Sequence, residues 1–248
     1  MDRFGNTGMA DAIAGALDWW REAGVDCNFA DDAQSWLAEE QEPQAEAAPP
    51  ERKPAPKPAT PAPEPEAPKL DKASIPNALP AFQDWWLAEP LLADGPPSRR
   101  VSPRGTAGAK LMVLVPEPER EDRETLLSGP QGKLLSAMLA AMGIAEDQAY
   151  LASALPRHTP GADWAAIHAL GMADVIARHV ALAAPERLMI LGTNVLSLSG
   201  HEPPQGPAVL RIFNHEGGSV PLLAARGLPA LLEQPRWRAA IWRSWLDW

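Results

Sequence analysis

Cysteine is almost absent from this chain. Among 248 residues there is one, Cys27. A single thiol excludes an intramolecular disulfide, and it excludes any zinc or iron–sulfur site that needs several cysteine ligands. We therefore expect neither a metal nor a cofactor.

Long apolar runs are also lacking. None reaches the roughly 20 residues that a membrane-spanning helix requires. The segment Met1–Ala16 has neither the basic start nor the apolar core of a secretion signal. We therefore expect a soluble, cytoplasmic protein that does not contact a membrane, and we expect it to be a monomer.

Positive charge is scarce in the first part of the chain. Residues 1–98 carry 7 Lys and Arg against 18 Asp and Glu, whereas residues 99–248 carry 15 against 14. An acidic segment repels phosphates, so only the second part is a candidate for binding DNA. In residues 99–248 the arginines that could contact phosphates are Arg226, Arg236, Arg238 and Arg243. Arginines beside tryptophans are equally common in protein interfaces.

One amphipathic helix is expected in the N-terminal region, residues 1–41. It covers Asp11–Asp26, and Ile13, Leu17 and Trp20 share its apolar face. Trp19 lies about 100° further round the helix and flanks that face. The two tryptophans either fold back onto the main domain or anchor the helix in a partner's groove.

A linker is expected at residues 42–80. This segment consists mostly of Pro, Ala, Glu and Lys, with almost no bulky apolar residues. It cannot bury enough surface to offset the entropy of ordering, so it should be disordered and, because of its prolines, extended. The folded domain should then occupy residues 81–248.

The segment Lys110–Gly143 organises that domain. Leu111–Val115 is a short, continuous apolar run, typical of a strand buried on both faces. After a loop, Ser128 and Gln131 have capping-box spacing at the start of an amphipathic helix that ends at Gly143. In such a unit the loop lies at the carboxyl end of the strand, where open α/β sheets place their ligands.

The rest of the domain alternates between strand and helix patterns. Further strands are expected at 149–152, 187–191, 209–214 and 220–224, and further helices at 79–92, 163–183 and 228–248. This alternation predicts an α/β fold, namely a three-layer α/β/α domain with a four-stranded, mainly parallel sheet.

Several motifs in this domain are similar to those of a known superfamily. The loop and the helix start read Val115-Pro116-Glu117-Pro118-Glu119 and Leu127-Ser128-Gly129-Pro130-Gln131-Gly132-Lys133-Leu134-Leu135. They resemble the Gly-Glu-x-Pro-Gly and Phe-Val-Gly-x-x-Gly-x-Leu-Leu segments of the uracil-DNA glycosylase superfamily, nearest to its bacterial family 4 type. The resemblance covers roughly Phe82–Trp248, and it implies the fold of that superfamily.

The resemblance assigns base-pocket positions, and most of the expected side chains are missing there. Glu117 keeps a glutamate, whereas Leu127, Ser153 and Gly227 stand where the family has a stacking aromatic, a base-reading asparagine and a histidine. Uracil excision needs the base to be stacked and read and its developing charge to be stabilised. We therefore expect a pseudoenzyme without uracil-excision activity. The family's iron–sulfur cluster is excluded by the cysteine count.

A shorter resemblance indicates a partner-binding role. The run Leu228-Pro229-Ala230-Leu231, continuing through Arg238-Ala239-Ala240-Ile241-Trp242, is similar to the last helix of the psi subunits of the bacterial DNA polymerase III clamp loader. Those subunits also carry a Trp-containing N-terminal segment that docks on the clamp-loader collar. The resemblance implies an adaptor in DNA replication or repair, with the front helix binding a protein partner.

An enzymatic alternative stays open. A divergent glycosylase for a damaged or unusual base would use Glu117 and His158 as its acid–base groups. His158 and Asp163 are otherwise a loop histidine and a helix N-cap. The acidic residues between 117 and 122 could bind a divalent metal, but a solvated acidic loop is the expected account.

Overall fold

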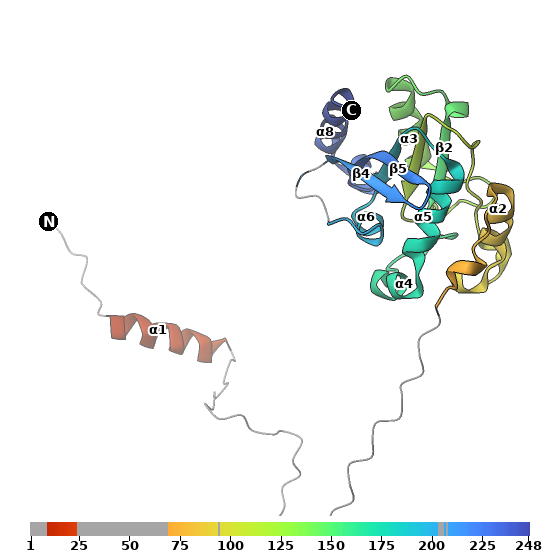
Figure 1. Ribbon diagram of the computed structural model, residues 1–248. Helices are drawn as coiled ribbons and strands as arrows, with labels where there is room; N and C mark the ends of the chain where they lie inside the picture. Colours follow the sequence, from red (N-terminus) through yellow and green to blue (C-terminus); the bar gives the residue numbers. More distant parts are fainter. Residues whose placement is uncertain (1–8, 24–68, 94, 203–205, 207) are drawn as a thin grey trace, which may run out of the picture. The chain divides into compact units, whose positions relative to one another are not determined.

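The computed structural model describes residues 9–23, 69–93, 95–202, 206 and 208–248. The chain divides into two units, Met1–Thr60 and Pro61–Trp248. Helix α1 (Met9–Glu22) lies in the first unit, and all five strands lie in the second, the globular domain (Figure 1). Among the described residues no single helix is long and apolar enough to cross a membrane; the helices Trp164–Leu170 and Met172–Ala183 pass that test only together, and a 70° bend separates them.

The globular domain is an α/β domain built on a five-stranded, mostly parallel sheet. The strands are β1 (Leu111–Val115), β2 (Ala149–Ser153), β3 (Leu188–Leu191), β4 (Ala208–His215) and β5 (Gly218–Ala225), in the order β2-β1-β3-β5-β4. Four are parallel, and β4 pairs antiparallel with β5. The expected four-stranded sheet is one strand short, because all five expected strands, including both arms of the hairpin that turns after His215, join one sheet.

Helices cover both faces of the sheet. They are α2 (Leu79–Ala88), α3 (Pro130–Ala141), α4 (Trp164–Leu170), α5 (Met172–Ala183), α6 (Thr193–Leu198), α7 (Leu228–Glu233) and α8 (Pro235–Leu246). Met112 and Leu114 of β1 belong to one hydrophobic core, with residues of α2, α5 and α6. Leu111, Val113 and Val115 belong to a second core, with residues of α3, α7 and α8. The alternation of β1 side chains between two cores explains its continuous apolar sequence.

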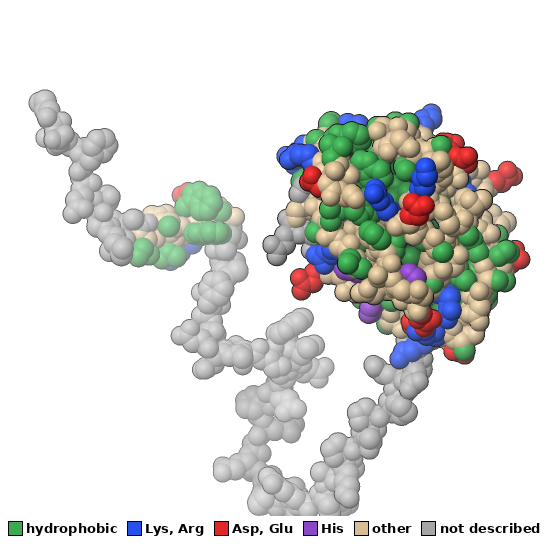
Figure 2. All heavy atoms as spheres, turned by 45° about the horizontal axis from the view of Figure 1, so that its top comes forward, with side chains coloured by type: hydrophobic (Ala, Val, Ile, Leu, Met, Phe, Trp, Pro, Cys, Tyr) green, Lys and Arg blue, Asp and Glu red, His purple; other side chains and the backbone are tan. Residues whose placement is uncertain are grey.

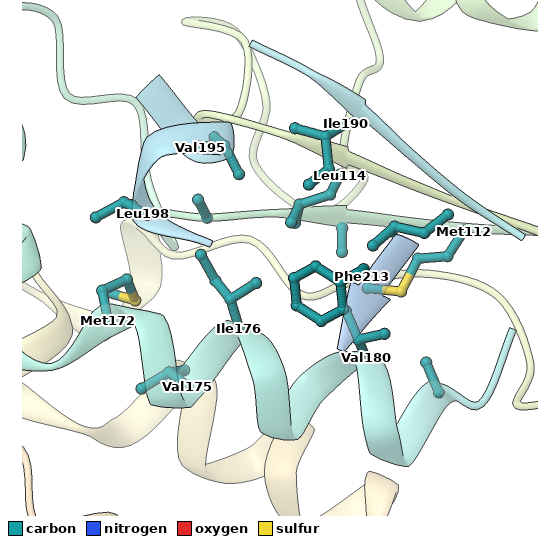
Figure 3. Close-up of a cluster of buried hydrophobic side chains, with 14 of the residues drawn as sticks. Met112, Leu114, Met172, Val175, Ile176, Val180, Ile190, Val195, Leu198 and Phe213 are labelled. Carbon is teal, nitrogen blue, oxygen red and sulfur yellow. The ribbon is translucent and has the colours of Figure 1, made fainter. Parts of the chain in front are cut away.

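Figure 3 shows the first core between α5 and the strands. Ile176 and Val180 point from α5 toward the strands that carry Met112 and Leu114, and these four side chains are at most 3% exposed. Fully burying an aliphatic side chain of this size contributes about 1.5–3 kcal/mol each. This face therefore supplies a large share of the domain's stability.

The domain begins about ten residues earlier than expected. The Leu70 N–H donates to the Leu170 carbonyl at 2.8 Å, Ile75 is buried, and Lys72 pairs with Asp174 at 3.2 Å and with Glu216 at 2.7 Å. Residues 70–80, assigned to the linker by composition, are therefore part of the folded domain. Residues 42–68 of the expected linker lie outside the described residues.

Two helices expected as continuous are broken. Gly171, with φ of 101°, separates α4 from α5 in the stretch 163–183. Pro235 begins α8 directly after Gln234, which ends α7 with an extended backbone. Glycine permits the left-handed conformation and proline cannot continue a helical hydrogen-bond ladder, so both breaks have a local cause.

A polar pair lies inside the first core. The Tyr150 hydroxyl and Nε2 of His179 are joined by a hydrogen bond of 2.9 Å, and Nε2 of Gln83 donates to the same hydroxyl at 3.5 Å. Burial lowers the pKa of His179 from 6.5 to about 3 and raises the pKa of Tyr150 from 10.0 to about 12. Both groups are therefore neutral at pH 7.

Candidate functional site

Four strand ends meet at the carboxyl edge of the sheet. Pro116 follows β1 and packs on Gly192, which follows β3; a Cβ on Gly192 would lie 2.6 Å from Cγ of Pro116. Gly227 follows β5 and lies beside the carbonyl of Leu191, since a Cβ there would be 3.7 Å from that oxygen. The loop after β2 packs on the same edge, because the Leu155 N–H donates to the Pro116 carbonyl at 3.0 Å. This edge is the candidate site of an open α/β sheet.

The carboxylate of Glu119 caps helix α3 from the loop after β1. It accepts the N–H groups of Gly129, Gln131 and Gly132 at 3.0, 3.0 and 2.9 Å. The expected capping box of Ser128 and Gln131 is wrong: the N-cap is Gly129, which has no side chain to accept a bond. A negative group at a helix N-terminus is favoured by the unpaired N–H groups and the helix dipole.

Asp122 closes the same loop. Its carboxylate accepts the N–H groups of Glu119, Leu127 and Ser128 at 2.7–2.8 Å and the Ser128 hydroxyl at 2.6 Å. Asp122 is 2% exposed and Glu119 is 6% exposed, so the expected solvated acidic loop is wrong for both residues. In the described part of the chain no group of three or more Asp, Glu, His or Cys side chains is placed to hold a metal ion.

The positions that the sequence resemblance would assign to a base pocket lie at or near this edge, and the side chains at two of them are buried. Leu127 is 4% exposed and packs into the second core, with a left-handed φ of 58°. Ser153 is 1% exposed and donates its hydroxyl to the Leu155 carbonyl at 2.7 Å. Gly227 is the N-cap of α7. Leu127 and Ser153 are therefore structural in this arrangement and do not face open space.

The structure brings Glu117 and His158 together, although they are 41 residues apart in sequence. Nδ1 of His158 lies 3.5 Å from Oε1 of Glu117 and donates to the Pro118 carbonyl at 3.1 Å. Oε2 of Glu117 accepts the N–H of Thr159. A carboxylate beside an imidazole can orient a ring that transfers protons, so this is the one predicted acid–base pair with suitable geometry. Asp163 is the N-cap of α4, as expected.

Four arginines that sequence reasoning missed gather beside this pair. Arg99, Arg120, Arg123 and Arg157 line a hollow of about 220 Å³ together with His158 and Asp122. They come from three separate segments, before β1, after β1 and after β2, so no spacing in the sequence could have revealed them. Only the packing of these loops at one edge of the sheet brings the charges together.

The exposed apolar face of helix α1 is a second candidate site. Its expected partner-binding residues are all exposed, Ile13 by 55%, Leu17 by 53% and Trp20 by 50%, and the flanking Trp19 is exposed by 62%. The two indole rings meet edge to face with centroids 5.3 Å apart. Large apolar side chains that remain exposed along one helix mark a surface suited to an interface.

Tryptophans and arginines alternate on α8. The guanidinium groups of Arg226 and Arg236 lie 4.4 and 4.7 Å from the ring centre of Trp237, at cation–π distance. Trp242 is 40% exposed. Figure 2 shows hydrophobic and basic side chains side by side over this part of the globular domain. Arg226 and Arg236 therefore already contact the Trp237 ring, which favours a structural role for them over phosphate binding.

No family model matches the chain, and no curated protein matches it in sequence.

Proposed function

We propose that this protein is a non-catalytic adaptor of DNA replication or repair, with a uracil-DNA glycosylase-like globular domain and a partner-binding helix, α1. The observation that carries the proposal is the exposed apolar face of α1, with Ile13, Leu17 and Trp20 each at least half exposed. A helix of 14 residues is marginal by itself in water, so a partner that covers this face would also stabilise it. The replication or repair context is supported by the resemblances in sequence.

The filled base-pocket positions support the non-catalytic part of the proposal. A flipped base needs a stacking ring and an amide to read its edge. Leu127 is packed into the core and Ser153 is bonded to its own loop, so neither can take these roles without rearrangement. The α/β fold, with parallel strands in the order β2-β1-β3-β5, supports this part of the proposal.

Replacing Trp20 with alanine should abolish capture of the partner by α1. A buried interface tryptophan typically contributes ~2 kcal/mol or more, which is roughly a 30-fold loss of affinity. The measurement is a pull-down with the full chain, with residues 69–248 alone and with Trp20→Ala. A matched control is Trp19→Ala, which removes a tryptophan that flanks the apolar face and should reduce capture less. Equal recovery of partners by all four proteins would contradict docking through α1.

The pair of Glu117 and His158 favours one alternative, a divergent glycosylase for a damaged or unusual base. In that case His158, held at Nδ1 by the Pro118 carbonyl and with Glu117 3.5 Å away, would assist proton transfer at the carboxyl edge of the sheet. This alternative requires a base pocket elsewhere than at the positions that the resemblance assigns, because Leu127 and Ser153 are buried there.

Uracil should not be released from DNA by this protein. Each missing stacking, reading or charge-stabilising group is expected to lower the rate by about 10²-fold or more. The measurement is incubation with uracil-containing single- and double-stranded DNA, followed by cleavage of abasic sites, with parallel substrates that carry oxidised or alkylated bases. Release of one of these other bases, lost in both Glu117→Gln and His158→Gln, would favour the alternative. Rapid uracil release would contradict the proposal.

A further inference from the structure

Two hollows on the globular domain share one side chain, Arg157. The first is the arginine-lined hollow already described. The second, also about 220 Å³, lies between the segment after α2 and helix α4. Its floor is apolar and includes Leu92, Leu155 and Met172, which are buried in the first core, and Leu91 stands at its rim, 40% exposed. The charged hollow and the apolar groove therefore lie side by side, with Arg157 in the lining of both.

The arginine-lined hollow has unused capacity for an anion. In the described part of the chain none of its four arginines forms an ion pair. Nε of Arg157 is buried without a hydrogen-bond partner, a costly state for a donor. The carboxylate of Asp122, on the same wall, is already occupied by four donors from its own loop. The lining therefore carries four positive charges against one negative charge that is already satisfied.

The surroundings of the hollow distinguish between possible anions. Glu117 and Glu119 lie in the same loop as Arg120 and Arg123, together with the exposed Glu121 and Glu124. A long phosphate backbone crossing this edge would meet these carboxylates as well as the arginines. Among the described residues no aromatic side chain lines the apolar groove, so a nucleobase would find no stacking partner there. A short ligand with separate carboxylates and an aliphatic group fits both hollows better.

We infer that the two adjacent hollows bind an acidic peptide segment of a partner protein. One or two of its carboxylates would lie among Arg99, Arg120 and Arg157, and an adjacent apolar side chain would fill the groove beside Leu91. Arginine pairs with carboxylates through charge-assisted, often bidentate hydrogen bonds, and the apolar contact adds specificity for the neighbouring residue. This inference rests on the proposed adaptor function. In that function α1 binds one partner protein, and the acidic segment of a second partner would bind the globular domain.

The test is fluorescence anisotropy of the full chain with a labelled peptide of four aspartates followed by two leucines, at low ionic strength. We expect saturable binding that weakens as salt is added. A peptide with two serines in place of the leucines should bind ~5-fold more weakly because it cannot fill the groove. Arg157→Gln should weaken binding by ~10-fold or more, and Leu91→Ser by ~3-fold.

Matched controls separate this site from general charge and hydrophobicity. Arg238→Gln changes an arginine of α8, and Leu232→Ser changes a leucine of α7 that is 41% exposed, nearly the same as Leu91. Both control variants should bind the peptide as the unchanged protein does. The inference is overturned if either control weakens binding as much as its counterpart. It is also overturned if inorganic phosphate or a labelled thymidine oligonucleotide binds the hollow more tightly than the peptide.

Failure of this test is distinguishable from failure of the proposed function. Trp20→Ala should not change the affinity for the acidic peptide, because every residue that lines the two hollows belongs to the globular domain. If the peptide fails to bind while Trp20→Ala still loses its partner, the adaptor proposal stands and this site is wrong. If the peptide binds and Trp20→Ala keeps its partner, the site stands and docking through α1 is wrong.

Discussion

Replacing Gly132 with alanine should lower the free energy of unfolding of the globular domain by about 3 kcal/mol or more. A Cβ at this position would lie 2.6 Å from the carbonyl carbon of Leu127 and closer still to its oxygen. Leu127 cannot move away easily: its N–H is bonded to Asp122 at 2.7 Å and its side chain is buried. Relief of the clash would therefore disrupt the buried carboxylates, whose loss leaves several N–H groups unsatisfied.

The measurement is chemical denaturation of the full chain, followed through the near-ultraviolet signal of the domain's tryptophans. Lys133→Ala is the matched control, since it changes the next, exposed residue of the same helix and should shift stability by less than ~0.5 kcal/mol. Gly129→Ala should fall between the two, because its Cβ would meet Oε2 of Glu119 at 2.7 Å, the end of a side chain that can adjust. If Gly132→Ala were within ~1 kcal/mol of the unchanged protein, the loop would have to be more adaptable than its hydrogen bonds indicate.

This loop also shows where sequence reasoning stops. The pattern predicted strand β1 and helix α3 because apolar periodicity reports directly which face of an element is buried. It assigned Glu119 and Asp122 to solvent because acidic residues in a loop are usually hydrated. Both are buried because the backbone N–H groups between residues 127 and 132 need acceptors, and the folded loop lets two carboxylates supply them. Which N–H groups need an acceptor depends on the path of the backbone, and that path cannot be predicted from the composition of the loop.

The candidate site was predictable only in part, for a similar reason. The rule that ligands bind at the carboxyl ends of parallel strands predicted a site at this edge, and the structure brings Glu117 and His158 together there. The arginine-lined hollow could not be predicted, because Arg99 comes from a segment before β1 that carries no strand or helix pattern. The early start of the domain was missed because Leu70 and Ile75 are isolated apolar residues in a polar segment, and only their packing shows that they are anchored.

Stability should fall as the pH is lowered from about 6.5, because of His179. Its pKa is 6.5 when unfolded and about 3 when buried in the core. Above pH 6.5 both states hold a neutral ring, so His179 adds no pH dependence. Below pH 6.5 the unfolded chain takes up a proton that the folded chain does not accept, and stability decreases by up to ~1.4 kcal/mol per pH unit. This loss continues until the pH reaches the folded pKa.

The same core should lose stability at alkaline pH through Tyr150. Its folded pKa of about 12 lies above the unfolded value of 10.0, so its contribution is complete below pH 10 and is lost as the pH rises toward 12. The measurement is urea denaturation of the full chain from pH 5 to 11. His179→Gln keeps a polar group beside the Tyr150 hydroxyl but cannot titrate, so it should flatten the acid side alone. Tyr150→Phe should flatten the alkaline side alone.

The acid side must be measured above pH 5 to isolate His179. The pKa of Glu216 is lowered by its hydrogen bond to Lys72, so this exposed carboxylate also loses a stabilising contact as the pH falls below its usual range. Between pH 6.5 and 5 carboxylates remain ionised, and the histidine dominates the slope. If His179→Gln keeps the slope of the unchanged protein in this window, another histidine must change its protonation on folding. The buried pair of Tyr150 and His179 would then not be the origin of the pH dependence.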